Sequence, residues 1–435
     1  MKQKYSLIPF VVFLGIFIGL NIFYADIEQT AKDCFPIFAV FIAIAVAFFT
    51  FPKNTTLQEK IDVFVNGSAE PIIIHMCYIF MLSTVFTYIL EKISAIEAAV
   101  NMSLYVTPVS FLLPGLFIII SLFSLTIGSS MGSIAAFMPI AIKLATTAGI
   151  PLPLICGIVV CGSMFGDNLS ILSDTTIAAV KVTNCSMMDK FKINAQIALP
   201  AFITSLCILL HQNTLYAQNI TSITNYAPHI SDIIALTPYF LIFLLAIYGL
   251  DILITLSLSI FAATAIGLLT NKFSPSECIP FIFDGFYQSK GMVHVFVLVI
   301  FLSGLSKIIS HNGGIEYLLK KIESNITGPI HARFAIFFLV FFVNCAIVIN
   351  TISIVVTGPI AIKIGKKHNL KSSEVATILD IGSCVSQGIL PYTPQLLLAA
   401  SMAKISALAI LPYLGYQYIL CGSIFGYFFD KKILQ

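Results

Sequence analysis

The sequence predicts an all-α polytopic membrane protein with about 12–14 membrane segments, at roughly 20 apolar residues per crossing. Of its 435 residues, 58% are hydrophobic and only 10% are charged, whereas soluble domains carry about a quarter charged residues. Short sequence matches recur half a chain apart, and polar residues interrupt otherwise apolar runs. Together these observations predict two inverted-topology repeats with interrupted helices, in which re-entrant hairpins are an alternative for the shortest segments.

The first half alternates apolar runs with short polar turns. Its first run follows Lys2 and Lys4 without a small-residue cleavage pattern, so we expect a retained membrane helix with a cytoplasmic amino terminus. A polar linker with Lys53 and Lys60 follows the second run. The short run Ser133–Ala148 is the best candidate for a hairpin. The expected segments are Ser6–Tyr24, Phe35–Phe51, Pro71–Leu90, Val106–Ile127, Ser133–Ala148, Pro151–Val180 and Ala195–His211.

The second half repeats the first after a polar loop. Its first two expected segments are Ile233–Tyr248 and Leu250–Leu269. Beyond them, Pro139-Ile-Ala-Ile-Lys143 recurs as Pro359-Ile-Ala-Ile-Lys363, and Gly162-Ser163 recurs as Gly382-Ser383. Three shorter matches fall at nearly the same offset, which is about half the chain length. We therefore expect a tandem duplication, with residues 1–222 as the first repeat half and residues 223–435 as the second, in one membrane domain.

The lysines predict how the halves are oriented, because cytoplasmic loops carry an excess of Lys and Arg. The turn at Lys143 has one base and falls outside, whereas its second-half equivalent has four and falls inside: Lys363, Lys366, Lys367 and Lys371. Counting crossings also places Lys181, Lys190 and Lys192 inside. The repeats are therefore expected to be inverted, with both termini cytoplasmic. Inverted repeats with interrupted helices are typical of secondary transporters, whose substrate site lies near the midplane.

One polar stretch, Gly162–Thr176, interrupts the run Pro151–Val180. A charge at the centre of a membrane helix costs about 2.5–3.5 kcal/mol on insertion scales, so charges kept there usually face an ion, a cavity or a partner. Oxygen ligands suit an alkali cation, and an unwound segment adds carbonyls and helix dipoles. We expect a cation and proton site with Na+ at Asp167 and Asp174; the alternative is a set of polar groups that only satisfy each other. The candidates are Asp167, Asn168, Ser170, Ser173, Asp174, Thr175 and Thr176.

The equivalent stretch of the second half is Asp380–Pro394. Pro391 and Pro394 break a helix there, because proline lacks the amide donor and clashes with the preceding turn. Gln387 stands where the first half has Asp167, and the carboxylate has moved to Asp380. A structural kink with capping polar groups is the alternative to a functional role. The residues expected to complete the site from the opposite side are Asp380, Ser383, Gln387 and Thr393.

Two further features are candidates for a role in transport. A polar cluster precedes each Pro-Ile-Ala-Ile-Lys copy, and it is expected either to line the site as a hairpin tip or to let helices pack closely. His75 and His294 occupy equivalent positions in the two halves; one interpretation is a proton relay, and the other is a histidine that bonds a backbone carbonyl. The residues of the two clusters are Ser129, Ser130, Ser133, Asn350, Thr351 and Ser353.

Several function classes are excluded by missing patterns. The sequence contains no P-loop and no HExxH motif, which argues against an ATP-driven pump and an intramembrane zinc protease. The ten cysteines are scattered without metal-binding spacing. A formal net charge of +3 gives no indication of nucleic-acid binding. We therefore expect a protein that is not an enzyme and needs no cofactor besides its coupling ions.

The polar stretch also resembles a known family. Gly166-Asp-Asn-Leu-Ser-Ile-Leu-Ser-Asp-Thr-Thr176 resembles the signature region of the NhaC-type Na+/H+ antiporters of the ion-transporter superfamily. Gly128-Ser-Ser-Met-Gly-Ser133 is similar to that family's Gly-Thr-Ser-Trp-Gly-Thr, with Met131 where Trp is usual. Asp380 to Thr393 resembles the family's acidic residue followed by a Pro-Trp-Asn turn, altered at both the aromatic and the amide. The resemblance implies a cation-coupled exchanger in the bacterial plasma (inner) membrane.

We therefore expect a secondary active transporter that exchanges Na+ for H+ by alternating access, because a carboxylate that is either Na+-loaded or protonated couples the two flows. The alternative is a Na+- or H+-coupled transporter of an amino acid or small carboxylate, which the resemblance also implies. A channel or sensor with the same fold is a lesser alternative. The expected partners are Na+, H+ and the lipid bilayer, without nucleic acid and with a homodimer left open.

Overall fold

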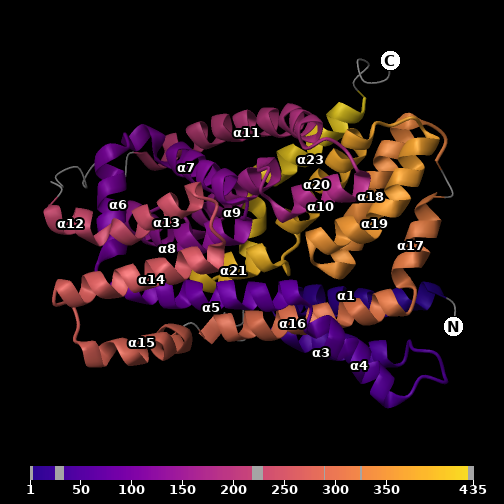
Figure 1. Ribbon diagram of the computed structural model, residues 1–435, viewed down its shortest axis with the longest axis horizontal. Helices are drawn as coiled ribbons and strands as arrows, with labels where there is room; N and C mark the ends of the chain where they lie inside the picture. Colours follow the sequence, from indigo (N-terminus) through magenta and orange to yellow (C-terminus); the bar gives the residue numbers. More distant parts are fainter. Residues whose placement is uncertain (1–2, 25–33, 218–228, 289, 324–325, 430–435) are drawn as a thin grey trace.

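The computed structural model describes residues 3–24, 34–217, 229–288, 290–323 and 326–429, and within these ranges the regular secondary structure is helical throughout. Most long helices run along the longest axis of the molecule (Figure 1). α1 (Ile8–Phe23) begins at the same end of the molecule at which α23 (Gly415–Phe428) ends. The prediction of an all-α membrane protein is confirmed.

The first half of the described chain runs from η1 (Gln3–Leu7) to α11. The linker that holds Lys53 and Lys60 is partly helical: α4 begins after Thr56, whose side chain forms a capping box with Glu59. A further helix, α6, occupies the turn expected after Leu90. The remaining elements are α3 (Phe35–Phe48), α4 (Leu57–Ser68), α5 (Pro71–Lys92), α6 (Ala95–Val106), η2 (Val109–Phe111), α7 (Leu112–Ile127), α8 (Ser130–Ala148), α9 (Leu152–Leu169), α10 (Asp174–Thr183) and α11 (Met187–Ala217).

The second half begins after residues 218–228, which lie outside the described ranges and include most of the expected polar loop. Its helices include the two segments expected there, Ile233–Tyr248 and Leu250–Leu269, with small changes of bounds. They are α12 (Ile230–Ala235), α13 (Thr237–Ile247), α14 (Ile252–Leu269), α15 (Pro275–Gln288), α16 (Lys290–His311), α17 (Gly314–Glu323), α18 (Pro329–Ile347), α19 (Asn350–Lys367), α20 (Ser372–Ile389), α21 (Pro394–Ala403), α22 (Ala407–Ile410), η4 (Leu411–Tyr413) and α23.

Among the described residues, 8 helices are long and apolar enough to cross a membrane, or 9 when a pair bent by 101° after α21 is taken as one span. Shorter apolar helices account for the larger number of segments expected from the sequence: Phe35–Phe48, Ala95–Val106, Leu112–Ile127 and Ile230–Leu245. The short run at Ser133–Ala148 is longer than expected. Ser129 accepts a hydrogen bond from the Gly132 amide and so starts α8 at Ser130, which gives a helix of spanning length.

Two long helical runs are interrupted by four residues each. α9 ends at Leu169, and the chain is extended at Ser170 and Ser173 before α10 begins. α20 ends at Ile389 because Pro391 restricts the preceding residue to extended backbone. In the first break, which has no proline, the Ser170 hydroxyl accepts the Leu172 amide at 3.2 Å and stabilises the turn. Both interrupted helices that the sequence predicts are therefore present.

The elements around these breaks recur at one constant offset. α8, α9 and α10 begin at 130, 152 and 174, and α19, α20 and α21 begin at 350, 372 and 394. Gly128 has a φ of 69°, and Val348, its equivalent, has a φ of 65°. A left-handed conformation is costly for a β-branched residue, so its retention at Val348 shows how strictly the turn is repeated. These recurrences support the proposed division into two repeat halves.

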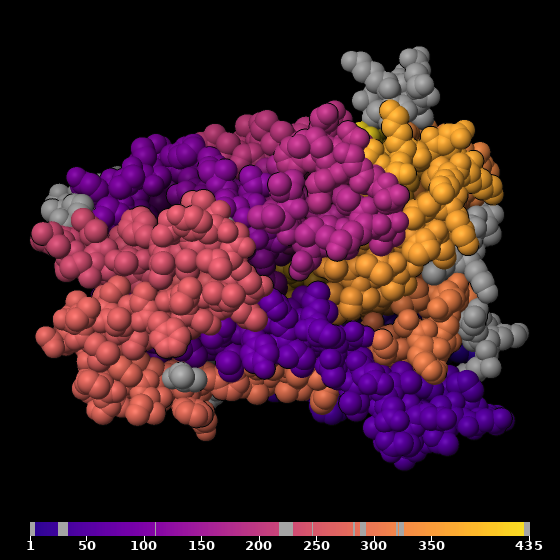
Figure 2. Space-filling model, in the orientation of Figure 1, coloured from indigo at the N-terminus to yellow at the C-terminus, as the bar shows by residue number. Residues whose placement is uncertain are grey.

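α9 and α20 contact each other near the middle of the molecule (Figure 1). α9 packs closely on α7, where a Cβ added at Gly166 would lie 2.4 Å from the Leu125 amide nitrogen. α11 and α10 both contact α20, so residues that follow the first break reach the second half. This packing brings polar groups of the two halves together at the breaks. Figure 2 shows a hollow near the middle of one face, where segments of both halves meet.

Candidate cation site

Five charged side chains are buried in the described ranges: Asp167, Lys190, Arg333, Glu374 and Asp380. Four of them form two ion pairs, Lys190 with Asp380 and Arg333 with Glu374. Asp167 forms no ion pair with any described residue. Because an isolated buried charge is costly, the surroundings of this carboxylate indicate what it binds.

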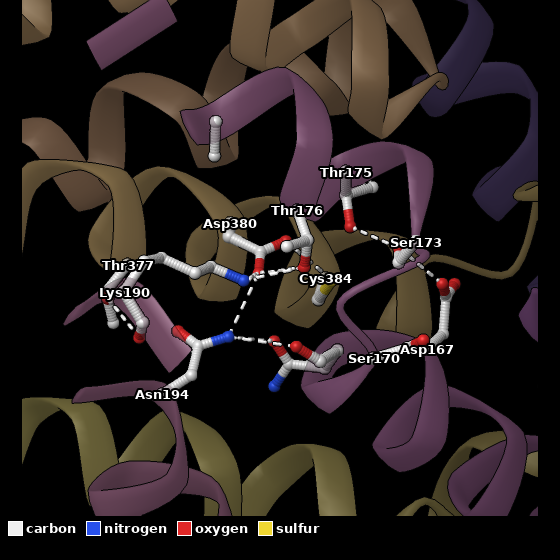
Figure 3. Close-up of polar contacts among 12 residues, drawn as sticks. Asp167, Ser170, Ser173, Thr175, Thr176, Lys190, Asn194, Thr377, Asp380 and Cys384 are labelled. Carbon is white, nitrogen blue, oxygen red and sulfur yellow. Dashed lines mark hydrogen bonds and ion pairs between the residues drawn. The ribbon is translucent and has the colours of Figure 1, made fainter. Parts of the chain in front are cut away.

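Asp167 lies near the end of α9 and faces hydroxyl groups. The Ser173 Oγ donates a hydrogen bond to its Oδ1 at 2.7 Å, and the hydroxyls of Ser173 and Thr175 lie 2.9 Å apart (Figure 3). Ser130, the first residue of α8, approaches the same carboxylate with its side chain and its backbone amide. The carboxylate is therefore held by a break in one helix and the amino-terminal end of another.

Asp380, near the middle of α20, has different partners. Lys190 donates to its Oδ2 and also to the Thr176 hydroxyl at 2.7 Å. Asn194 donates to the same Oδ2 at 3.0 Å and to the Asn168 carbonyl at 2.9 Å (Figure 3). Lys190 and Asn194 are four residues apart and thus on one face of α11, so both reach the same oxygen atom. Asp380 is a paired charge that joins α11, α10 and α20.

Cys384 lies between the two carboxylates. Its thiol is 3.7 Å from Oδ1 of Asp380 and also contacts the Thr175 hydroxyl, which belongs to the Asp167 cluster. Asp167 and Asp380, which come from different halves, are thus connected through three side chains, those of Ser173, Thr175 and Cys384. The two carboxylates belong to one polar centre in which only Asp380 has a cationic partner among the described residues.

Amide side chains of the second half extend this centre. Gln387 donates to the Gln395 Oε1 at 2.9 Å and accepts from Asn344 at 3.0 Å. Gln395 in turn donates to the Ser130 hydroxyl at 3.2 Å. Gln387 occupies the repeat position of Asp167, so the second half presents amides where the first presents a carboxylate. The chain of contacts ends at Ser130, beside Asp167.

The predicted first-half residues separate into two groups. Asp174, the first residue of α10, is exposed. The other six predicted residues are buried, and the structure brings them to the break: Asp167, Asn168, Ser170, Ser173, Thr175 and Thr176. Thr176 and Asn168 contact the partners of Asp380 rather than Asp167. The stretch Gly162–Thr176 therefore supplies residues to the surroundings of both Asp167 and Asp380.

The predicted second-half residues are all buried. Asp380 and Gln387 lie in the polar centre as described above. Ser383 donates to the Asp380 backbone carbonyl at 2.9 Å, and Thr393 donates to the Leu390 carbonyl at 2.8 Å. Both hydroxyls are therefore used within their own helix or break. The contacts of these two hydroxyls agree with the alternative given above, a structural kink with capping polar groups.

The remaining candidates lie around the centre. Ser133 donates to the Ser129 carbonyl at 2.9 Å within the first turns of α8. Ser353 donates to the Asn344 Oδ1 at 3.0 Å, and the Asn350 side chain accepts the Thr351 amide at 3.0 Å. These residues occupy the starts of α8 and α19, and Ser130 and Ser353 reach the polar network. His75 and His294 lie on α5 and α16, helices other than those that carry the two carboxylates.

Lys190 and Asn194 are site residues that the sequence does not single out. Lys190 is expected from its sequence context to be a cytoplasmic lysine, but its side chain is 2% exposed and paired with Asp380. The signal is weak: a Lys and an Asn four residues apart in a stretch with two other lysines. A stronger indication is the intramembrane Asp380 itself, because such a carboxylate requires a partner.

Comparison with known proteins places the chain in a family. The sequence model described as the Na+/H+ antiporter family matches residues 209–429, just over half of the chain. The chain belongs to the Na+/H+ antiporter family. A second model, described as the C4-dicarboxylate anaerobic carrier, matches residues 1–214. The family resemblance seen in the motifs is thereby confirmed.

Curated relatives include exchangers of several solutes. The chain is 23% identical to the Na(+)/H(+) antiporter NhaC of Bacillus subtilis (strain 168), with 96% of this chain and 97% of that protein covered. It is 22% identical to the malate-2H(+)/Na(+)-lactate antiporter of the same organism, over 74% of each chain. It is 21% identical to the arginine/ornithine antiporter ArcD of Halobacterium salinarum (strain ATCC 700922 / JCM 11081 / NRC-1), with 81% and 78% covered. The protein is a multi-pass antiporter and not an enzyme.

Proposed function

We propose that this antiporter exchanges Na+ for H+ and that the carboxylate of Asp167 is the binding site the two ions share. The main support is that Asp167 is buried, is surrounded by hydroxyl groups and has no ion-pair partner among the described residues. A buried carboxylate of this kind is stabilised either by a bound cation or by protonation. Na+ and H+ both satisfy that requirement.

The hydroxyls around Asp167 suit both ions. A serine or threonine hydroxyl has one donor and two acceptor lone pairs, and it rotates to suit its partner. Ser173 therefore donates to the bare carboxylate, as it does in this structure at 2.7 Å, or turns an oxygen lone pair toward a bound cation. Oxygen ligands are the preferred ligands of hard cations. Ser130 and Thr175 supply further oxygen atoms at the same place.

Coupling follows from competition at one carboxylate. The empty site carries an uncompensated buried charge, so the change between outward and inward access is unfavourable until a cation or a proton is bound. Either ion removes that penalty, but the two do not bind together. Na+ that moves one way is therefore exchanged for H+ that moves the other way, through the alternating access expected of inverted repeats. We place this exchange in the bacterial plasma membrane, with both termini cytoplasmic.

The test is Na+/H+ exchange in proteoliposomes with Asp167→Asn. An imposed Na+ gradient should move protons in the unaltered protein with no organic solute present. Asp167→Asn should lower the rate at least 100-fold, because the amide neither binds Na+ as a carboxylate does nor releases a proton. The matched control is Asp174→Asn, which makes the same chemical change at an exposed position seven residues away and should retain most of the activity. Coupled exchange that survives in Asp167→Asn would contradict the assignment.

A second candidate function is exchange or uptake of a small carboxylate or an amino acid coupled to Na+ or H+. The amides of Gln387 and Gln395, linked to Ser130 beside Asp167, favour it because they are hydrogen-bonding groups for an organic anion near the cation site. Two of the relatives are named for such solutes. If proton movement in the same vesicles begins only after malate, lactate or arginine is added, this function replaces simple Na+/H+ exchange. Uncoupled flux that does not saturate would instead indicate a channel.

A further inference from the structure

We propose that Lys190 is a tethered cation that neutralises Asp380 permanently, so that the protein exchanges one Na+ for one H+ without moving net charge. This inference rests on the shared Asp167 site proposed above. Lys190 lies outside the sequence motifs described above. The motifs also do not predict the exchange ratio, which is the number of H+ exchanged for each Na+.

The contacts of Lys190 indicate that it is a permanent partner of Asp380, and not a group that an ion from solution displaces during transport. Its ammonium group donates to the Asp380 Oδ2 and to the Thr176 hydroxyl. Asn194 occupies the same Oδ2 from one turn further along α11. The side chains of Lys190 and Asp380 are 2% and 0% exposed, so water does not replace a lost partner. A cation from solution would have to displace both Lys190 and Asn194 to reach this oxygen.

The pair fixes the charge of the buried centre. Arg333 and Glu374 neutralise each other on α18 and α20, and Lys190 neutralises Asp380. One uncompensated negative charge then remains among the described buried side chains, at Asp167. A single monovalent cation makes the centre neutral, and it is sufficient whether it is Na+ or H+. Both loaded forms are thus electrically equal, and a full cycle of exchange moves no net charge.

If Lys190 instead carried a proton, the number of H+ exchanged for each Na+ would be different. If one Na+ released the Lys190 proton as well as the Asp167 proton, one Na+ would exchange for two H+, the loaded forms would differ in charge and the membrane potential would drive exchange. The dependence of exchange on membrane potential therefore distinguishes a lysine that pairs permanently with Asp380 from one that carries a proton. A merely structural lysine would affect the rate and the stability, but it would not set the exchange ratio.

The experiment measures the Na+ gradient at which proton movement reverses, in proteoliposomes whose membrane potential is clamped with K+ and valinomycin. For the unaltered protein, reversal should occur where the Na+ ratio equals the H+ ratio at every clamped potential. Movement of one net charge would instead shift the Na+ ratio at reversal tenfold for every change of about 59 mV, and that result overturns the inference. Absence of any exchange overturns the proposed function as well, so the two failures are distinguishable.

Two variants test Lys190 directly. Lys190→Gln leaves Asp380 unpaired and adds a second uncompensated carboxylate, so two cations are needed to neutralise the centre and exchange should become slower. The matched control is Lys190→Gln with Asp380→Asn, which removes both charges and keeps one uncompensated carboxylate. Its reversal should stay independent of potential, whatever its rate. A reversal that depends on potential in the unaltered protein but not in this double variant would show that Lys190 carries a proton, and this comparison remains decisive even if the single variant fails to fold.

Discussion

Ser173 joins two parts of the candidate site with a single hydroxyl, since it lies 2.7 Å from Asp167 and 2.9 Å from Thr175. We expect Ser173→Ala to weaken Na+ binding about tenfold or more, because a hydrogen bond to a charged group contributes about 1.5–3 kcal/mol and the variant also removes an oxygen ligand. The measurement is the Na+ concentration for half-maximal exchange in proteoliposomes.

The control for this change is Ser205→Ala. Ser205 is also buried, and its hydroxyl donates to the Ala201 carbonyl within α11 at 2.7 Å. Removal of that hydroxyl should leave the Na+ dependence unchanged. Equal effects of the two variants would mean that Ser173 acts through general packing and not through the carboxylate.

At this scale the sequence predicts the composition of the site better than its pairing. Asp167, Ser173 and Thr175 gather as expected because the residues are close in the chain and the helix is broken between them. Asp174 is exposed, because the break turns it away from the face that an unbroken helix would give it. Lys190 reaches Asp380 from a distant part of the sequence, and only the packing of α11 on α20 reveals that contact.

Among the elements, the contact of α9 with α7 depends on Gly166. A Cβ at this position would lie 2.4 Å from the Leu125 amide nitrogen and 2.5 Å from the Ser121 carbonyl oxygen. Gly166→Ala should therefore push α9 away from α7 and cost about 1–3 kcal/mol, as overpacking of a tight interface does. The measurement is the temperature at which half of the detergent-solubilised protein loses its monodisperse peak.

Gly422→Ala is the matched control for this substitution. Gly422 lies inside α23 with no atom within 4 Å of an added Cβ. Alanine is the better helix former by about 0.5–1 kcal/mol, so the transition temperature should be unchanged or slightly higher. A Gly166→Ala protein as stable as this control would show that α7 and α9 are not held at the distance observed.

The two helix breaks show which helix ends could be predicted from the sequence. Pro391 and Pro394 predict the second break from covalent chemistry alone, and the polar run from Gly166 predicts the first. The boundaries of α6 and α17 could not be derived in this way. Both are short helices that follow a left-handed residue, Ser94 and Gly313, and their residues show no polar break that distinguishes them from turns between longer apolar runs.

For the whole molecule, the recurrence of elements at a constant offset extends to individual contacts. The Ser124 hydroxyl donates to the Ser163 carbonyl in the first half, and the Asn344 amide donates to the Ser383 carbonyl in the second. The repeat could be predicted from sequence because the matches share nearly one offset. The inverted sense of the two halves depends on the lysine distribution, so it requires a direct measurement.

Single cysteines at equivalent positions provide that measurement. Thr147 and Lys367 are both exposed near the ends of α8 and α19, and they occupy the same position in the two repeats. In a background in which the 10 native cysteines are replaced, Thr147→Cys should react with a membrane-impermeant maleimide on intact cells. Lys367→Cys should react only after the membrane is permeabilised, because the lysines around it hold its turn in the cytoplasm. Labelling of both positions from the same side would mean that the halves are parallel, and the two carboxylates would then no longer approach the centre from opposite faces of the membrane.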